Sequence, residues 1–118
     1  MKKRIKSFGF AFKGIKLVFG SEANMKIHLF VSLLVVICGF IFSISSIEWM
    51  MCILCFGLVF GAEMINTSIE NIVNLVSPEQ NELAGKAKDI AAGAVLICAI
   101  AAAIVGLIIF VPKALILL

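Results

Sequence analysis

The sequence has few charged residues and no tyrosine. Only 14% of its 118 residues are Asp, Glu, Lys or Arg, whereas 63% are hydrophobic. Soluble domains carry about a quarter charged and roughly half apolar residues, so this composition excludes an ordinary soluble domain. The apolar residues fall into runs of the length that spans a bilayer, about 17 to 25 residues. A chain this short fits a single domain.

Several common functional motifs are missing as well. The chain contains neither GxxxxGK[ST] nor GxGxxG, the usual phosphate-binding loops. His28 is the single histidine, and without a second one we interpret it as a hydrogen bonder at the membrane interface. Cys52 and Cys55 have CxxC spacing inside an apolar run, where we interpret them as small packing residues because redox and zinc motifs need polar access.

The N-terminal segment, residues 1–21, has the pattern of an amphipathic helix. Its apolar stripe recurs at three- and four-residue steps and consists of Ile5, Phe8, Phe12, Ile15 and Phe19. Lysines lie largely off this stripe, as in helices that lie on an anionic membrane surface. The interleaved phenylalanines and the apolar run that follows argue against a nucleic-acid arm. The basic start is followed by an amphipathic stretch with Lys13 and Lys16 instead of a compact apolar core with a cleavage site, which argues against a cleaved signal peptide.

Three further segments are predicted to be membrane-spanning helices. They cover residues 27–44, 47–76 and 83–111, and Pro112 is expected to end the last. Ser21 is positioned to cap the first of them, and Trp49 is placed as an interface anchor of the second. The fold class predicted for residues 1–118 is therefore one all-α membrane domain, with a surface helix and three spans.

The basic residues predict the orientation. Nine of the 10 precede the first span or follow the second, which leaves Lys113 alone for the other side. The positive-inside rule then places the N-terminus in the cytoplasm and the C-terminus outside the cell membrane.

A polar face on the second span is the most informative feature. Glu63, Asn66, Glu70 and Asn74 follow at steps of three, four and four residues, so a helix presents them on one narrow face. Ionisable residues at membrane depth are costly and usually functional. We therefore interpret this face as the active site.

The predicted topology brings other charged residues to the same depth, namely Glu22, Lys88 and Asp89. Repulsion among several carboxylates is relieved by a divalent cation, and oxygen ligands suit Mg²⁺ with its phosphate partners. A buried Glu63 suits a general base acting on a lipid hydroxyl. The arrangement favours phosphoryl transfer from ATP to a lipid alcohol; a merely structural polar ridge and a cation or proton channel are the alternatives.

These residues also resemble a known family. The stretches that carry the likeness are EMINTSIE at residues 63–70, ELAGKAKD at 82–89, AAGAVL at 91–96 and SEAN at 21–24. Together they resemble the bacterial diacylglycerol kinases, small integral-membrane lipid kinases. The resemblance implies a homotrimer with active sites shared between subunits.

The resemblance also implies roles for particular residues. Glu63 corresponds to the base and, with Ala92, contacts the lipid, while Asn66 is a polar residue of the active site. Glu22 and Glu70 correspond to the metal carboxylates that also contact ATP. Further nucleotide contacts are implied at Lys3, Phe10, Glu79, Gln80, Asn81, Lys88 and Asp89.

The lipid substrate is suggested by two further stretches. Residues 24–28 (NMKIH) and 62–66 (AEMIN) resemble the Gram-positive branch of the family, whose members act mainly on undecaprenol. We therefore expect an undecaprenol kinase, with diacylglycerol as the alternative substrate.

Overall fold

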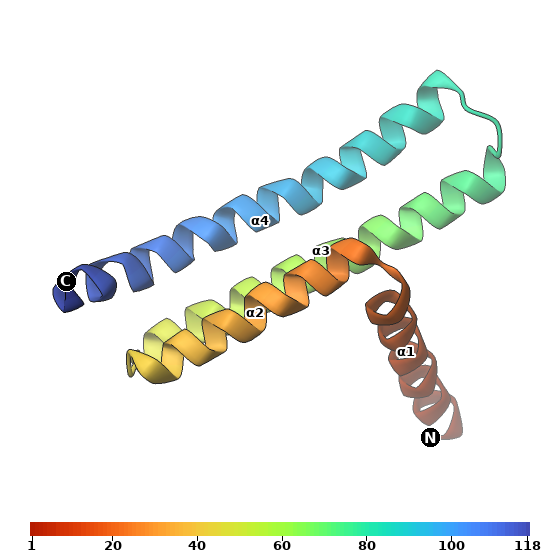
Figure 1. The fold of residues 1–118 in the computed structure, drawn as a ribbon. Helices are drawn as coiled ribbons and strands as arrows, with labels where there is room; N and C mark the ends of the chain where they lie inside the picture. The colour runs from red at the N-terminus through yellow and green to blue at the C-terminus, as the bar shows by residue number, and fades with distance from the viewer.

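The computed structural model describes residues 1–118 and is entirely helical. It contains α1 (Lys2–Ser21), α2 (Ala23–Ile41), α3 (Ser46–Val76) and α4 (Glu82–Leu117) (Figure 1). The prediction of an all-α chain with four helices is confirmed.

The helices form an open bundle rather than a closed one. α3 and α4 run antiparallel and make most of the contacts between helices, while α2 lies along α3 and contacts α4 little. α1 leaves the bundle at a steep angle (Figure 1). We call the end with the α3–α4 turn and the α1–α2 junction the polar end, and the end with the α2–α3 turn and the C-terminus the C-terminal end.

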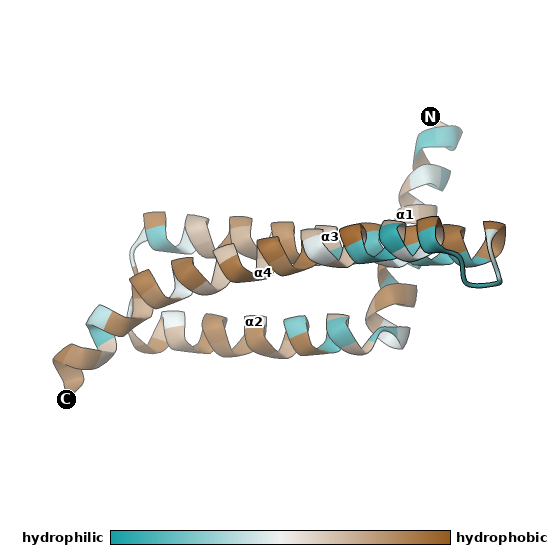
Figure 2. Cartoon of the chain, turned by 90° about the horizontal axis from the view of Figure 1, so that it is seen from above, coloured by the Kyte–Doolittle hydropathy of each residue, from teal (hydrophilic) through white to brown (hydrophobic).

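The three long helices are suited to a membrane. α2, α3 and α4 are each long and apolar enough to cross one. Most of their leucine and isoleucine side chains are exposed, which is unfavourable in water but favourable in lipid. Hydrophilic residues gather toward the α3–α4 turn and at the start of α1 (Figure 2).

At the C-terminal end, a close contact joins α2 to α3. A Cβ added to Gly39 would lie 2.5 Å from Cη2 of Trp49, so only glycine fits there without a shift. The ring of Trp49 also lies 5.0 Å from that of Phe40, centroid to centroid. Trp49, predicted as an interface anchor, thus also packs the two helices together.

The start of α3 is fixed by a capping box. The backbone N–H of Glu48 donates to Ser45 Oγ at 3.2 Å, and the backbone N–H of Ser45 donates to Glu48 Oε1 at 3.0 Å. These bonds satisfy two donors that a helix start leaves free. The other carboxylate oxygen of Glu48 lies 2.6 Å from Lys113 Nζ, which joins the start of α3 to the end of α4.

Helix boundaries differ most from the predicted ones at both ends of α2 and at the end of α4. Ser21 does not cap α2, because it is the last residue of α1 and its hydroxyl donates to the Leu17 carbonyl at 2.7 Å. Glu22 is the N-cap, so α2 begins at Ala23, before the predicted residue 27, and ends at Ile41.

Pro112 lies inside α4 instead of ending it. Proline costs a helix one hydrogen bond, but polar side chains nearby can satisfy freed carbonyls in a membrane helix. The carbonyl that Pro112 leaves without its backbone donor is that of Ile108, while Lys113 Nζ donates to the next carbonyl, that of Ile109, at 3.1 Å. The helix continues to Leu117. The predicted end at residue 111 is therefore wrong.

α1 packs against the other helices through its last residues. Val18 is buried there, and Phe19 packs edge-on against Phe60 of α3 with ring centroids 5.4 Å apart. The rest of the predicted apolar stripe is exposed, so it is free to meet a surface other than this chain.

Candidate active site

The polar face of α3 is buried where the helix passes between its neighbours. Glu63 is 1% exposed, Asn66 5% and Thr67 6%, and they are the buried polar side chains of the molecule. The Asn66 amide donates to Glu70 Oε1 at 3.0 Å, which confirms the prediction that these two share a face. Asn74, farther along, is exposed.

Two acceptor atoms on this face have no partner. Glu63 Oε2 and Asn66 Oδ1 are buried without a hydrogen bond. The nearby Thr67 hydroxyl donates at 3.0 Å to the backbone carbonyl of Glu63, not to its carboxylate. An unpaired buried polar group costs about 1–3 kcal/mol, and more if it is charged. Such atoms suit a hydroxyl donor or a cation that is present only during function.

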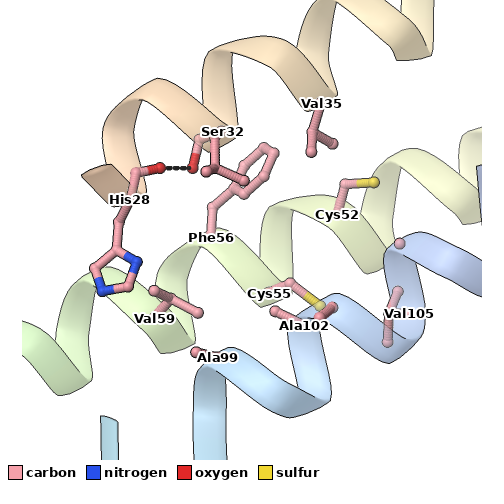
Figure 3. Close-up of a pocket in the computed structure, with 13 residues that line it drawn as sticks. His28, Ser32, Val35, Cys52, Cys55, Phe56, Val59, Ala99, Ala102 and Val105 are labelled. Atoms are coloured by element: carbon pink, nitrogen blue, oxygen red, sulfur yellow. Dashed lines mark hydrogen bonds between the residues drawn. The ribbon is translucent and has the colours of Figure 1, made fainter. Parts of the chain in front are cut away.

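His28 lies at this site, although the sequence did not predict it as a site residue. Its Nε2 lies 3.7 Å from Glu63 Oε2, and its side chain is 20% exposed against 2% for Glu63. The imidazole ring of His28 points from α2 toward α3 (Figure 3). Met25, one turn before His28 on the same face of α2, is fully buried, but no pattern in the sequence of α2 indicated which face meets α3.

An apolar cavity of about 290 Å³ continues from His28 between α2, α3 and α4 (Figure 3). Ten of its 13 lining residues are hydrophobic. An apolar cavity of about 150 Å³ stays dry and binds benzene, so this one has room for a longer apolar group. His28 lines this cavity and also lies beside Glu63 Oε2, so the cavity adjoins the carboxylate with the free oxygen.

A second, polar hollow of about 270 Å³ lies at the α3–α4 turn. Its lining includes four residues predicted to contact ATP: Glu79, Gln80, Asn81 and Lys88. The turn is held by its own hydrogen bonds, since Asn81 Oδ1 accepts from the Ala84 N–H at 2.8 Å and Asn81 Nδ2 donates to Ser77 Oγ at 2.6 Å. Lys88 has no ion pair within 4.0 Å, so its charge is available to a phosphate.

Other predicted site residues lie apart. Glu22 is half-buried at the α1–α2 junction, and Asp89 and Ala92 are exposed on α4. Lys3 and Phe10 are exposed on α1, which points away from the α3–α4 turn (Figure 1). The chain therefore gathers Glu63, Asn66, Glu70 and His28 in one place and four nucleotide candidates in another.

Of the two predicted metal ligands, Glu22 lies at the α1–α2 junction and Glu70 on α3. No group of three or more His, Cys, Asp or Glu side chains converges within the chain. However, Mg²⁺ usually takes only one or two protein carboxylates, with water and substrate phosphates completing its shell. Glu70, held by Asn66 and half-buried, fits that requirement, and the free Asn66 Oδ1 adds an oxygen beside it.

Fold and site together define a small all-helical membrane protein with a polar site between apolar helices. Residues 9–110 match the family model described as prokaryotic diacylglycerol kinase. The chain is 42% identical over 113 residues to the undecaprenol kinase of Bacillus subtilis, covering 96% of this chain and 92% of the relative. It is 38% identical to a diacylglycerol kinase of Synechocystis, covering 90% of this chain and 61% of that one.

A further relative is the diacylglycerol kinase of Escherichia coli, 33% identical over 85% of this chain and 82% of that one. The chain therefore belongs to the prokaryotic diacylglycerol kinase family and is a lipid kinase. The resemblance seen in residues 63–70 and 82–89 is confirmed.

Proposed function

We propose that this protein transfers the γ-phosphoryl group of ATP to undecaprenol and produces undecaprenyl phosphate. The observation that carries the reaction is the Glu63 carboxylate, which is buried and has a free oxygen between membrane-length helices. The choice of lipid rests on the 42% identity to an undecaprenol kinase over 96% of the chain.

The depth of Glu63 supports its role as the base. It lies 17 residues after Ser46, or roughly 26 Å along α3 at 1.5 Å per residue. In a hydrocarbon core of roughly 30 Å, this is just inside the interface at the polar end. A lipid hydroxyl reaches that depth while its chain stays in the membrane.

In the proposed reaction the hydroxyl gives its proton to Glu63 Oε2. The lipid oxygen forms a bond to the γ-phosphorus as the bond between that phosphorus and the ADP oxygen breaks. Asn66 positions Glu70 through their 3.0 Å hydrogen bond. The apolar cavity beside His28 excludes water from the reacting groups, and Ala92 on the facing helix α4 contacts the lipid.

The nucleotide is proposed to bind at the polar hollow. Glu79, Gln80 and Asn81 contact it, Lys88 meets the phosphates, and Asp89 lies one residue farther along α4. Glu22 and Glu70 would hold Mg²⁺, which neutralises phosphate charge when bound.

A homotrimer with shared sites is part of the proposal. Glu22, Lys3 and Phe10 lie apart from the hollow in one chain, and a neighbouring subunit would bring them to it. Gly57 and Gly61 form a GxxxG step with open space around both, which suits close approach of another helix. We also propose that the polar end, with Lys86 and Lys88, faces the cytoplasm and the C-terminus the outside.

Diacylglycerol is the alternative substrate, supported by the two diacylglycerol kinases at 38% and 33% identity. Purified protein given radiolabelled ATP, Mg²⁺ and both lipids in matched vesicles tests the choice. We expect a higher kcat/KM for undecaprenol. A higher value for diacylglycerol would reverse the assignment, and no labelled lipid from either would overturn the proposed reaction.

A further inference from the structure

We propose that His28 is the proton exit of the active site: it takes the proton that Glu63 gains from the lipid hydroxyl and passes it to water. This inference rests on the proposed function, because it presupposes that Glu63 is the base. It adds a step that the role of Glu63 as base does not explain, namely how the buried carboxyl group loses its proton before the next turnover.

His28 points toward the free oxygen of the Glu63 carboxylate. His28 Nε2 lies 3.7 Å from Glu63 Oε2, and this same oxygen has no hydrogen-bond partner. The distance exceeds the 2.7–3.2 Å range of protein N–H···O bonds. Catalytic hydrogen bonds are often long in ligand-free structures and tighten in the reacting complex.

Exposure gives the transfer a direction. The Glu63 side chain is 2% exposed, whereas that of His28 is 20% exposed. A proton left on Glu63 therefore has no exit of its own. The imidazole lies beside the carboxylate and only five residues after the start of α2, roughly 8 Å from the polar end of that helix. Imidazole is also the side chain that gains and loses a proton most readily near neutral pH.

No other neighbour offers an equivalent path. The Thr67 hydroxyl is buried and bonded to the Glu63 carbonyl, and the Asn66 amide is bonded to Glu70. Ser32, one turn after His28, donates to the His28 carbonyl at 2.8 Å. The cavity beyond is lined mainly by hydrophobic residues, with the free thiols of Cys52 and Cys55 among them. Glu63 is the one carboxylate that lies within 4.0 Å of a ring nitrogen of His28.

The proton balance closes over one turnover. The lipid O–H bond breaks and Glu63 becomes a carboxylic acid while the phosphoryl group moves to the lipid oxygen. Glu63 then gives the proton to neutral His28 Nε2, which restores the carboxylate and leaves an imidazolium. The imidazolium releases the proton to water, and both residues return to their starting states.

Chemical rescue tests the proposal. The full-length protein carrying His28→Ala is assayed with undecaprenol vesicles, ATP and Mg²⁺ in a buffer without imidazole. We expect kcat to fall by roughly 10- to 100-fold, at the lower end of what a proton-transfer group contributes, with the KM for ATP unchanged. Imidazole added to the assay should raise kcat in a dose-dependent way, because a free imidazole can carry the proton in place of the side chain.

His28→Gln separates proton transfer from packing. Glutamine keeps an N–H donor and a similar size but cannot carry a proton, so the same loss of kcat is expected. Lys26→Gln removes an exposed charge two residues away on the same helix and should leave kcat and its response to imidazole as in the wild type. Circular dichroism and binding of a non-hydrolysable ATP analogue establish that each variant is folded.

Each outcome of these experiments either upholds or overturns the proposed role of His28. Wild-type turnover in either His28 variant would overturn the proposal, as would a folded His28→Ala that imidazole leaves unchanged. If His28→Ala does not fold, near-normal kcat in His28→Gln overturns it and loss of kcat upholds it. The wild type run in parallel separates the two levels: no lipid phosphorylation by the wild type would refute the proposed function, whereas an active wild type with an equally active variant would refute only the role of His28.

Discussion

The polar end and the C-terminal end of the bundle differ in how their polar groups are satisfied. At the C-terminal end, Glu48 uses one carboxylate oxygen in a capping box with Ser45 and the other in an ion pair with Lys113. At the polar end, Glu63 is more deeply buried, yet one of its carboxylate oxygens has no partner. A fully bonded glutamate thus stabilises the fold at one end, and the glutamate with a free oxygen at the other end is the one that we propose as the base.

Packing shows the same contrast. Trp49 fills the space above Gly39 so closely that no Cβ would fit, whereas an apolar cavity of about 290 Å³ extends from His28 toward the middle of the bundle. A tightly packed end holds the helices in register, and a loosely packed region leaves room for a ligand.

Glu63→Gln should give the largest effect, and this effect should be a loss of activity without a loss of stability. The amide has nearly the same shape but cannot accept the hydroxyl proton, so kcat should fall by about 100- to 10,000-fold. Thermal stability should be unchanged or higher, because an unpaired buried charge is removed. Lipid phosphorylation, ATP-analogue binding and thermal unfolding in detergent measure the three quantities.

Retention of normal turnover by Glu63→Gln would remove Glu63 as the base. Loss of ATP binding in the same variant would instead indicate that Glu63 belongs to the nucleotide site. Either result would weaken the contrast between the two ends.

Sequence patterns predicted the parts of this arrangement that depend on one helix. The spacing of Glu63, Asn66 and Glu70 put them on one face because a helix repeats every 3.6 residues. The length and composition of the apolar runs likewise predicted three helices long enough to span a membrane.

Features that depend on two helices were not predictable from spacing. The approach of His28 to Glu63 is set by how α2 rotates against α3, which no pattern within α2 specifies. Likewise, Pro112 was expected to end α4, but α4 continues to Leu117, and Lys113 beside the proline pairs with Glu48 of α3. Ser21, a common cap, bonds backward to Leu17 instead, so Glu22 is the N-cap of α2.

Gly39→Ala tests the packing of the C-terminal end and should have the next largest effect. The new methyl group would collide with the Trp49 ring, and overpacking of this kind costs about 1–3 kcal/mol of unfolding free energy. Fluorescence of Trp49, the single tryptophan, should report a looser environment and a lower unfolding midpoint. Gly9→Ala, in open space on α1, is the matched control, and equal midpoints for the two variants would show that the contact does not fix α2 against α3.

Glu48→Gln should have the smallest effect and is the counterpart of Glu63→Gln. It removes the charge that faces Lys113 but keeps an oxygen for the Ser45 N–H, since glutamine also completes a capping box. We expect a slightly lower unfolding midpoint than the wild type and unchanged kcat. High salt should narrow the difference in midpoint only partly, because the pair is partly buried and therefore less screened. Comparison with Lys113→Gln and the double variant isolates the pair, because a real interaction makes the two losses less than additive. Additive losses would show that the 2.6 Å contact contributes nothing, and a lowered kcat in Glu48→Gln would show that the two ends are coupled rather than separate in function.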